Sequence, residues 1–170
     1  MTDAAVESGR IGGIAGAQLA RLIALLLPIA LLGGALGSQY LGGLTPCEMC
    51  YWQRYPHAAA ILLAMLAYTG PAGSQRSRAY VLLAALAIAV SGAIGVYHAG
   101  VELDIFEGLT TCTATASGTG ADLLREIMNA PLVRCDQVQF SFLGISMAGW
   151  NAILSLGGAV AIVLLSRKAR

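Results

Sequence analysis

Charged residues are scarce in this chain of 170 residues: ten Lys or Arg and nine Asp or Glu make up 11% of it. Soluble domains are about 25% charged. The shortage of charge, together with 57% hydrophobic residues and a mean hydropathy of +0.72, excludes an ordinary soluble domain and predicts a protein embedded in a bilayer. A net charge of +1 and the lack of a nucleic-acid-binding motif argue against a nucleic-acid partner. The apolar run near the N-terminus is too long for a cleaved signal peptide.

Stretches without charge set the expected membrane spans, because a helix needs roughly 20 apolar residues to cross a bilayer core of about 30 Å. They predict an all-α membrane protein, a four-transmembrane-helix bundle forming a single domain over residues 1–170. The expected helices lie at about 19–38, 51–69, 79–98 and 143–166, joined outside the cytoplasm by loops 39–50 and 99–142. The second helix is short and carries Arg54. The first 18 residues are expected to be a frayed tail with a short interfacial lead-in.

The placement of the basic residues predicts the orientation of the chain. Most of them flank one side of the expected spans: Arg10, Arg21, Arg76, Arg78, Arg167, Lys168 and Arg170. Both termini are therefore expected in the cytoplasm, and all four cysteines on the opposite side of the membrane: Cys47, Cys50, Cys112 and Cys135. Disulfides persist outside the cytoplasm, which favours two disulfides over four reduced thiols. Three fully paired arrangements remain open.

A CxxC pair, Cys47 and Cys50, lies at the mouth of the second apolar segment. Residues three apart at a helix start share a face, and the helix dipole favours a thiolate there. Arg54 follows Cys50 by four residues on the same face, where its fixed charge lowers a cysteine pKa. An ionisable residue inside a membrane is functional by default. This pattern predicts a redox centre.

Three further polar residues stand near the same level. Gln39, at the outer end of the first helix, is either solvated or bonded to a carbonyl of a cofactor. His98, at the outer end of the third helix, can carry or donate a proton close to the CxxC pair. The position of His57 is consistent with membership of the site and equally with a polar contact between helices, and no role is assigned to it. Asn151 and the neighbouring Trp150 are interpreted as packing groups in the fourth helix.

The long loop carries the second pair of cysteines. Cys112 lies among small polar residues and is expected to be mobile and exposed. Residues 121–129 have the pattern of a short amphipathic helix on the membrane surface. An exposed disulfide between Cys112 and Cys135 would exchange easily with a thiolate of a soluble partner. Electrons would then pass to the CxxC pair and leave to a lipid-soluble quinone.

The residues also resemble a known family, the DsbB family of disulfide bond formation proteins, along nearly the whole chain. The resemblance rests on five features: Pro46-Cys47-x-x-Cys50, Arg54, Gln39 upstream, the two loop cysteines, and the segment 142–150 that opens the last helix. It implies a protein of the bacterial inner membrane that reoxidises a periplasmic thioredoxin-fold oxidase, DsbA-like, and reduces ubiquinone or menaquinone.

Residue roles follow from that resemblance. Cys50 matches the cysteine that engages the quinone, and Cys47 its exchange partner. Cys112 matches the cysteine that joins the soluble partner, with Cys135 as its resolving mate. Arg54 and Gln39 match quinone-site positions, and His98 falls near a histidine of that site. No metal is expected.

Two alternatives remain. A vitamin K epoxide reductase-like protein also combines CxxC with a quinone, but there the CxxC follows the loop cysteines. A structural zinc site would need four fixed thiolates. The surroundings of Cys112, the oxidising side and the lack of a supporting histidine or second CxxC argue against zinc.

Overall fold

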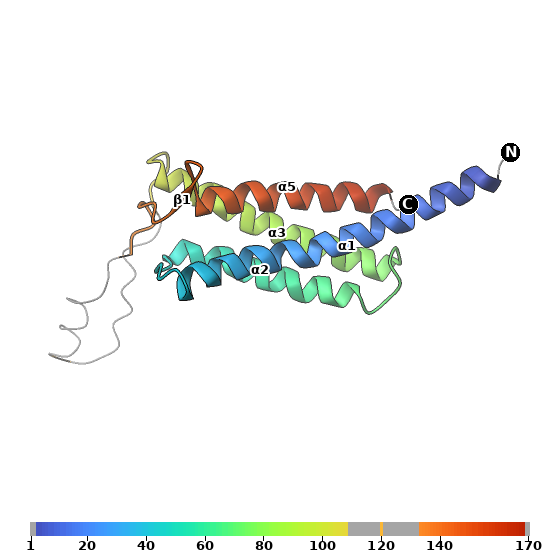
Figure 1. Ribbon diagram of the computed structural model, residues 1–170, viewed down its shortest axis with the longest axis horizontal. Helices are drawn as coiled ribbons and strands as arrows, with labels where there is room; N and C mark the ends of the chain where they lie inside the picture. Colours follow the sequence, from blue (N-terminus) through green and yellow to red (C-terminus); the bar gives the residue numbers. More distant parts are fainter. Residues whose placement is uncertain (1–2, 109–119, 121–132, 169–170) are drawn as a thin grey trace.

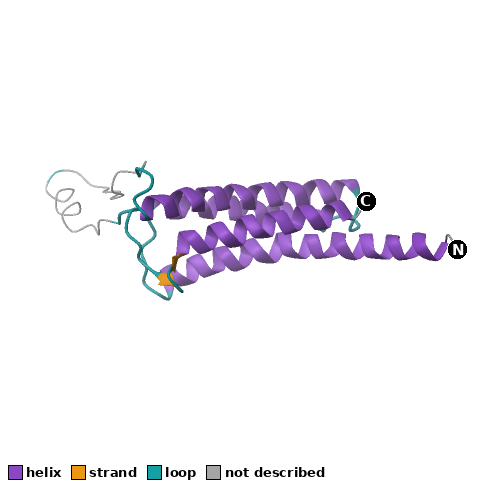
Figure 2. Cartoon of the chain, turned by 90° about the horizontal axis from the view of Figure 1, so that it is seen from above, coloured by secondary structure: helices purple, strands orange, loops and turns teal. Residues whose placement is uncertain are grey.

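The helices run side by side along one long axis, and both chain ends lie at the same end of the bundle (Figures 1 and 2). This computed structural model describes residues 3–108, 120 and 133–168. Its elements are α1 (Asp3–Tyr40), α2 (Glu48–Ala67), α3 (Gln75–Glu102), β1 (Ser141–Phe142), β2 (Ile145–Ser146) and α5 (Met147–Lys168). The most extensive contacts of α3 are with α2 and α5, and α1 packs on α2 and α5. The expected all-helical class is confirmed.

Three of the helices are long and apolar enough to cross a membrane: Gly13–Tyr40 in α1, Gln75–Glu102 in α3 and Met147–Arg167 in α5. Within the described ranges, the 20-residue α2 is not among them. It carries Arg54 and His57, which lower its hydropathy. The fourth span therefore stays a prediction.

Helix boundaries differ from the expected ones at several points. The expectation of a frayed tail before residue 19 is wrong, because α1 is continuous from Asp3. Alanine is the best helix former, and extending an existing helix adds one hydrogen bond for each residue fixed. α3 extends to Glu102, beyond the expected end at residue 98. α2 begins at Glu48 with Cys47 at the N-cap, in extended conformation (φ −77°, ψ 174°).

The last helix begins four residues later than expected, because a small hairpin precedes it. β1 and β2 pair antiparallel, with Ser141 opposite Ser146. Leu143 (φ 52°) and Gly144 (φ 77°) turn the chain, both in the left-handed region that a tight two-residue hairpin requires. The indole N–H of Trp150 donates to the carbonyl of Phe142 at 3.0 Å, which fastens the hairpin to α5. The hairpin lies beside the cysteine region.

The core near the chain termini is built mainly of alanine. Ala24, Ala60, Ala64 and Ala84 have no exposed surface, and Ile88 and Ile162 fill the space between them. Small residues let helix backbones approach closely, which is how membrane helices pack in the absence of a hydrophobic driving force.

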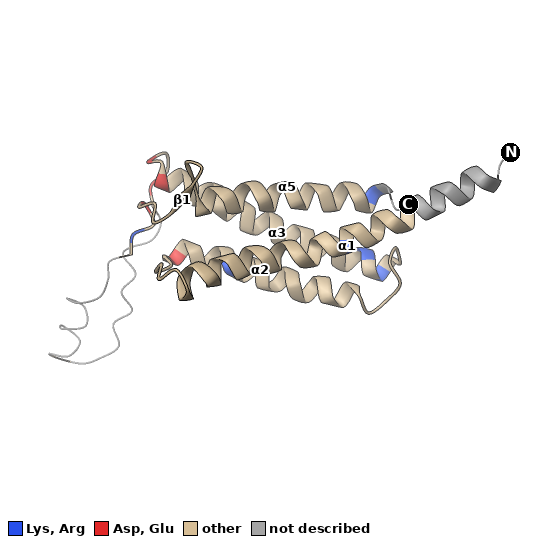
Figure 3. Ribbon diagram, in the orientation of Figure 1, with Lys and Arg blue, Asp and Glu red and all other residues tan. Residues whose placement is uncertain are grey.

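Charge is divided along the bundle (Figure 3). Basic residues gather at the end with the termini, and acidic residues at the opposite end. Two described arginines depart from this division, because Arg54 of α2 and Arg134 line the cavity beside the cysteines. Two predicted features fall outside the described residues: Cys112 and the surface helix expected at 121–129.

Candidate redox site at the acidic end of the bundle

The CxxC pair forms the start of α2. Cys47 is buried at 2% exposure, and its sulfur lies 3.1 Å from that of Cys50, within hydrogen-bonding distance for thiols. The hydrogen bond that Cys47 donates, with its burial, raises the pKa of Cys47. The same bond is the main cause that lowers the pKa of Cys50 from 9.0 to about 7, and the charge of Arg54 adds to it. Cys50 lies before the apolar run that begins at Tyr51, and it is the stronger nucleophile of the pair near neutral pH.

Arg54 lies one turn below Cys50, as the sequence predicted, and ties α2 to α1. Its guanidinium donates to Gln39 Oε1 at 2.5 Å and to the carbonyl of Ala35 at 3.0 Å. Its Nε is buried without a hydrogen-bond partner among the described residues. Gln39 is brought to the site through this contact with Arg54. It does not line the cavity itself.

His98 and Cys135 complete the cluster from the other side. The ring Nε2 of His98 lies 3.5 Å from the sulfur of Cys47. A nitrogen of His98 and the sulfurs of Cys47 and Cys135 all lie within 4.8 Å of one another. Cys135 and Cys47 are buried in one apolar cluster with Met49 and Val101. The structure thus brings a cysteine of the long loop to the CxxC pair, 85 residues away in sequence.

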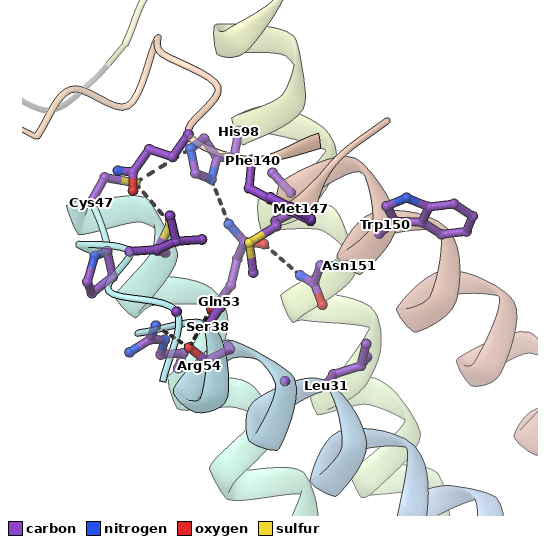
Figure 4. A pocket seen from close by; sticks show the side chains of 18 of the residues that line it. Leu31, Ser38, Cys47, Gln53, Arg54, His98, Phe140, Met147, Trp150 and Asn151 are labelled. Carbon is purple, nitrogen blue, oxygen red and sulfur yellow. Dashed lines mark hydrogen bonds between the residues drawn. The ribbon is translucent and has the colours of Figure 1, made fainter. Parts of the chain in front are cut away.

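A cavity of about 600 Å³ opens against this cluster (Figure 4). Its lining is mostly apolar and comes from α1, the loop before α2, and the start of α5, with Leu31, Phe140 and Met147 among the lining side chains. Cys50 and Arg54 stand in its wall. Ligand pockets are about 300–1,000 Å³, apolar, with a few placed polar groups. This cavity matches such a pocket in its volume and in its mostly apolar lining.

Sequence reasoning missed a group of buried polar residues in the same wall. Gln53 donates to His98 Nδ1 at 2.8 Å and accepts from the amide of Asn151 at 2.7 Å. Asn151, His57 and Ser91 bond to one another below them. A signal was present: Cys50, Gln53 and His57 follow one another at spacings of three and four, which places three polar groups on one helix face. Burying a polar group inside a membrane costs free energy, so such residues usually have a function.

The comparisons with known proteins identify the family of the chain. The family model "Disulfide bond formation protein DsbB" matches residues 17–165. The chain belongs to the DsbB family. Three proteins named disulfide bond formation protein B are similar to it. That of Aromatoleum aromaticum is 31% identical over 81% of this chain and 86% of its own length. That of Chromohalobacter salexigens is 31% identical over 84% of each chain. That of Xanthomonas campestris pv. campestris is 30% identical over 82% of this chain and 84% of its own. No solved structure matches the chain.

Membership confirms the predicted resemblance and makes this DsbB-family chain an oxidoreductase of disulfide bond formation. With three apolar helices, it is also a membrane protein.

The structure removes one of the arguments against a zinc site. A histidine does lie beside two of the cysteines, and Cys47, His98 and Cys135 together have the ligand types that zinc prefers.

Proposed function

We propose that this DsbB-family protein is a thiol:quinone oxidoreductase that reoxidises a DsbA-like dithiol oxidase and passes two electrons to ubiquinone or menaquinone. The observation that carries the proposal is the position of the CxxC pair. Cys47 is buried with the loop cysteine Cys135, and Cys50 faces a mostly apolar cavity beside Arg54. A thiol pair between a second cysteine and an apolar pocket has a source of electrons on one side and room for an acceptor on the other.

The sulfur chemistry follows by exchange. A thiolate of the soluble partner attacks a Cys112–Cys135 disulfide at Cys112, and Cys135 leaves as a thiolate. Cys135 then attacks the Cys47–Cys50 disulfide at Cys47, which releases Cys50 as a thiolate. The closeness of Cys135 to Cys47 supports this second step. Over a full cycle a partner dithiol becomes a disulfide and a quinone becomes a hydroquinone, so electrons and protons balance.

The residues present fit a quinone head group. The cavity is large enough, and its apolar walls suit a ring and an isoprenoid tail. Arg54 would face a carbonyl oxygen of the ring, with Gln39 and the carbonyl of Ala35 holding the guanidinium in place. When bound, the quinone supplies a two-electron, two-proton acceptor. The positive charge of Arg54 also favours the thiolate of Cys50.

We propose that the bundle crosses a bacterial inner membrane four times, with α2 as the fourth span and both termini in the cytoplasm. The division of charge along the bundle supports this orientation, because basic residues prefer the cytoplasmic side. Labelling of Leu41→Cys or Leu143→Cys in a cysteine-free background, at exposed positions near the cysteine end, with a membrane-impermeant maleimide tests it in intact cells from which the outer membrane has been removed. Labelling only after the inner membrane is broken contradicts the orientation.

The decisive assay measures quinone reduction by purified protein with a reduced DsbA-like partner. We expect turnover with quinone present, and trapping through Cys112 of a partner variant that lacks its own resolving cysteine, with Cys135 as the leaving thiolate. Trapping that persists after Cys112→Ser would remove Cys112 as the entry point. Comparing ubiquinone with menaquinone identifies the acceptor.

A metal-binding function is the second candidate, favoured by the Cys47, His98 and Cys135 cluster. Zinc would be held by two thiolates and an imidazole, and bound metal would block exchange. Metal analysis of the same preparation separates the two functions. One zinc per chain with no quinone reduction would refute the redox relay.

A further inference from the structure

Two backbone carbonyls fix the orientation of the buried amides below the CxxC pair. A carbonyl oxygen only accepts, so a side-chain amide that approaches one must present its NH2 group. Gln53 lies 3.2 Å from the carbonyl of Met49 by its Nε2, and Asn151 lies 3.2 Å from the carbonyl of Ser91 by its Nδ2. Both amide orientations are therefore set by the backbone.

The contacts of the side-chain oxygen of Asn151 agree with this orientation of its amide. Its Oδ1 lies 2.9 Å from Nε2 of His57 and accepts from the hydroxyl of Ser155 at 2.9 Å. The hydroxyl of Ser91 gives its hydrogen to the carbonyl of Gln53 at 2.8 Å. Nε2 of His57, 2.9 Å from the same hydroxyl oxygen, must then carry a proton. Each group around Asn151 can therefore be assigned as donor or acceptor in its hydrogen bonds without conflict.

The tautomer of His98 follows from these roles. The amide of Asn151 donates to Gln53 Oε1, and Gln53 donates to Nδ1 of His98, so Nδ1 has no proton. Nε2 then carries the hydrogen. It faces three groups that can accept it: the backbone carbonyl of Cys135, the sulfur of Cys47 at 3.5 Å and a carboxylate oxygen of Glu102 at 3.9 Å. Figure 4 shows this line of side chains from Asn151 through Gln53 and His98 to Cys47.

We propose that Gln53 and Asn151 are positioning residues that lock His98 as the neutral Nε2–H tautomer, so that its ring donates to the CxxC pair. This inference rests on the proposed redox function and adds to it. Asn151, Gln53, His98, Cys47 and Cys50 form a chain in which each group donates to the next and the last acceptor is Cys50. Hydrogen bonds arranged in series polarise one another. The chain stabilises the Cys50 thiolate through the hydrogen bond from Cys47, while Arg54 does so through its charge.

The lock also keeps His98 uncharged. A second proton on the ring would have to enter at Nδ1, where it would meet the NH2 group of Gln53. Turning the Gln53 amide over would break its bonds to both Met49 and Asn151. Several titratable or charged groups lie in the same region: Cys47, Cys50, Cys135, Arg54, Glu102 and Arg134.

The test is direct, because the chain has only two histidines. Nitrogen NMR of reduced protein labelled at histidine, without quinone or partner, reports the tautomer of each ring, and a His57→Phe variant assigns them. We expect His98 as the Nε2–H form in the unsubstituted protein. A Nδ1–H form or an imidazolium near pH 7 would overturn the lock, whatever the outcome of the quinone assay.

Variants then test the two positioning residues. Asn151→Leu removes the donor to Gln53, and we expect a mixture of His98 tautomers. In Gln53→Glu the ionised carboxylate offers only acceptors, so at a pH where this carboxyl is ionised we expect Nδ1 of His98 to be protonated. In a Cys112→Ser/Cys135→Ser background, ultraviolet titration of the thiolate should show the pKa of Cys50 raised in Asn151→Leu, because the other tautomer of His98 presents no Nε2–H to Cys47.

Ser155→Ala is the matched control. It removes a bond to Oδ1 of the same asparagine but leaves the amide donors in place. We expect the tautomer of His98 and the Cys50 titration to be unchanged in it. If Asn151→Leu does not fold, Gln53→Glu and the unsubstituted protein still decide the question. Unchanged His98 spectra in Gln53→Glu would refute the role of Gln53.

Discussion

At the end of the bundle that carries the chain termini, the helices meet through alanines with no exposed surface. At the cysteine end the same helices separate around a cavity of about 600 Å³, and amides, imidazoles and thiols occupy its wall. Close packing through small residues gains dispersion energy at every contact. A cavity forgoes those contacts, and buried polar groups are stable there only with partners.

The difference indicates that the two ends of the bundle have divided roles. The alanine core supplies stability at the terminal end, and the hydrogen bonds of the cysteine end supply orientation. Substitutions at the cysteine end should change chemistry more than stability, and substitutions in the alanine core the reverse. Four predictions test this division, from the largest expected effect to the smallest.

Cys50→Ser should abolish quinone reduction, a loss on the order of a thousandfold or more, because it removes the sulfur that faces the cavity. A steady-state assay of quinone reduction with a reduced DsbA-like partner measures it. Thermal unfolding in detergent should change little. The same variant should still trap the partner through Cys112; loss of trapping would mean that Cys50 also supports entry.

Arg54→Met should slow quinone reduction by roughly 10- to 100-fold, since a hydrogen bond to a charged group contributes about 1.5–3 kcal/mol. The variant keeps an unbranched apolar stem and removes the guanidinium group with its charge. Single-turnover measurements isolate the electron-transfer step. Formation of the mixed disulfide at Cys112 should be retained. A defect in trapping as large as the defect in reduction would contradict the separate roles of the two cysteine pairs.

Ala60→Leu should destabilise the bundle by about 1–3 kcal/mol, because Ala60 has no exposed surface and the larger side chain overpacks the core. Equilibrium unfolding in mixed micelles measures the change. Ala59→Leu is the matched control on an exposed face of the same helix. Quinone reduction by folded Ala60→Leu protein should be near normal. A large loss of turnover at unchanged stability would refute the division.

The reactivity of Cys50 should depend on pH with a midpoint near 7. Its pKa is lowered from 9.0 to about 7, chiefly by the hydrogen bond from Cys47, so the thiolate is present above this value and lost as the pH falls through it. Iodoacetamide labelling of reduced Cys112→Ser/Cys135→Ser protein, read by mass spectrometry, gives the profile. A midpoint at the ordinary thiol value of about 8.5 would show that neither Cys47 nor Arg54 activates Cys50.

The sequence predicted what depends on spacing along one helix. Cys47, Cys50 and Arg54 lie as the intervals of three and four require, and His98 lies beside them at the helix end. It could not predict contacts that depend on how helices turn toward one another. Gln39 touches Arg54 across the α1–α2 interface, and Asn151 reaches Gln53 from α5. Pattern alone makes such residues indistinguishable from packing groups.

Local backbone geometry was the other source of error. Residues 143–146 were expected to begin the last helix, yet residues 141–146 form a hairpin, because Leu143 and Gly144 adopt positive φ angles that an α-helix does not permit. The tail expected before residue 19 is helical because residues 3–18 contain no proline or other helix stop, and their alanines extend the helix.

Two arginines join α1 and α2 at opposite ends. Arg21 of α1 donates to the carbonyls of Ala67 and Gly70 at the end of α2, at 3.2 and 2.9 Å. Arg54 of α2 donates back to α1. Sliding one helix along the other would break both attachments at once, so the height of Cys50 against the cavity is fixed. We therefore expect α1 and α2 to keep their relative position during disulfide exchange, so that any rearrangement falls on α3, α5 and the loop that carries Cys135.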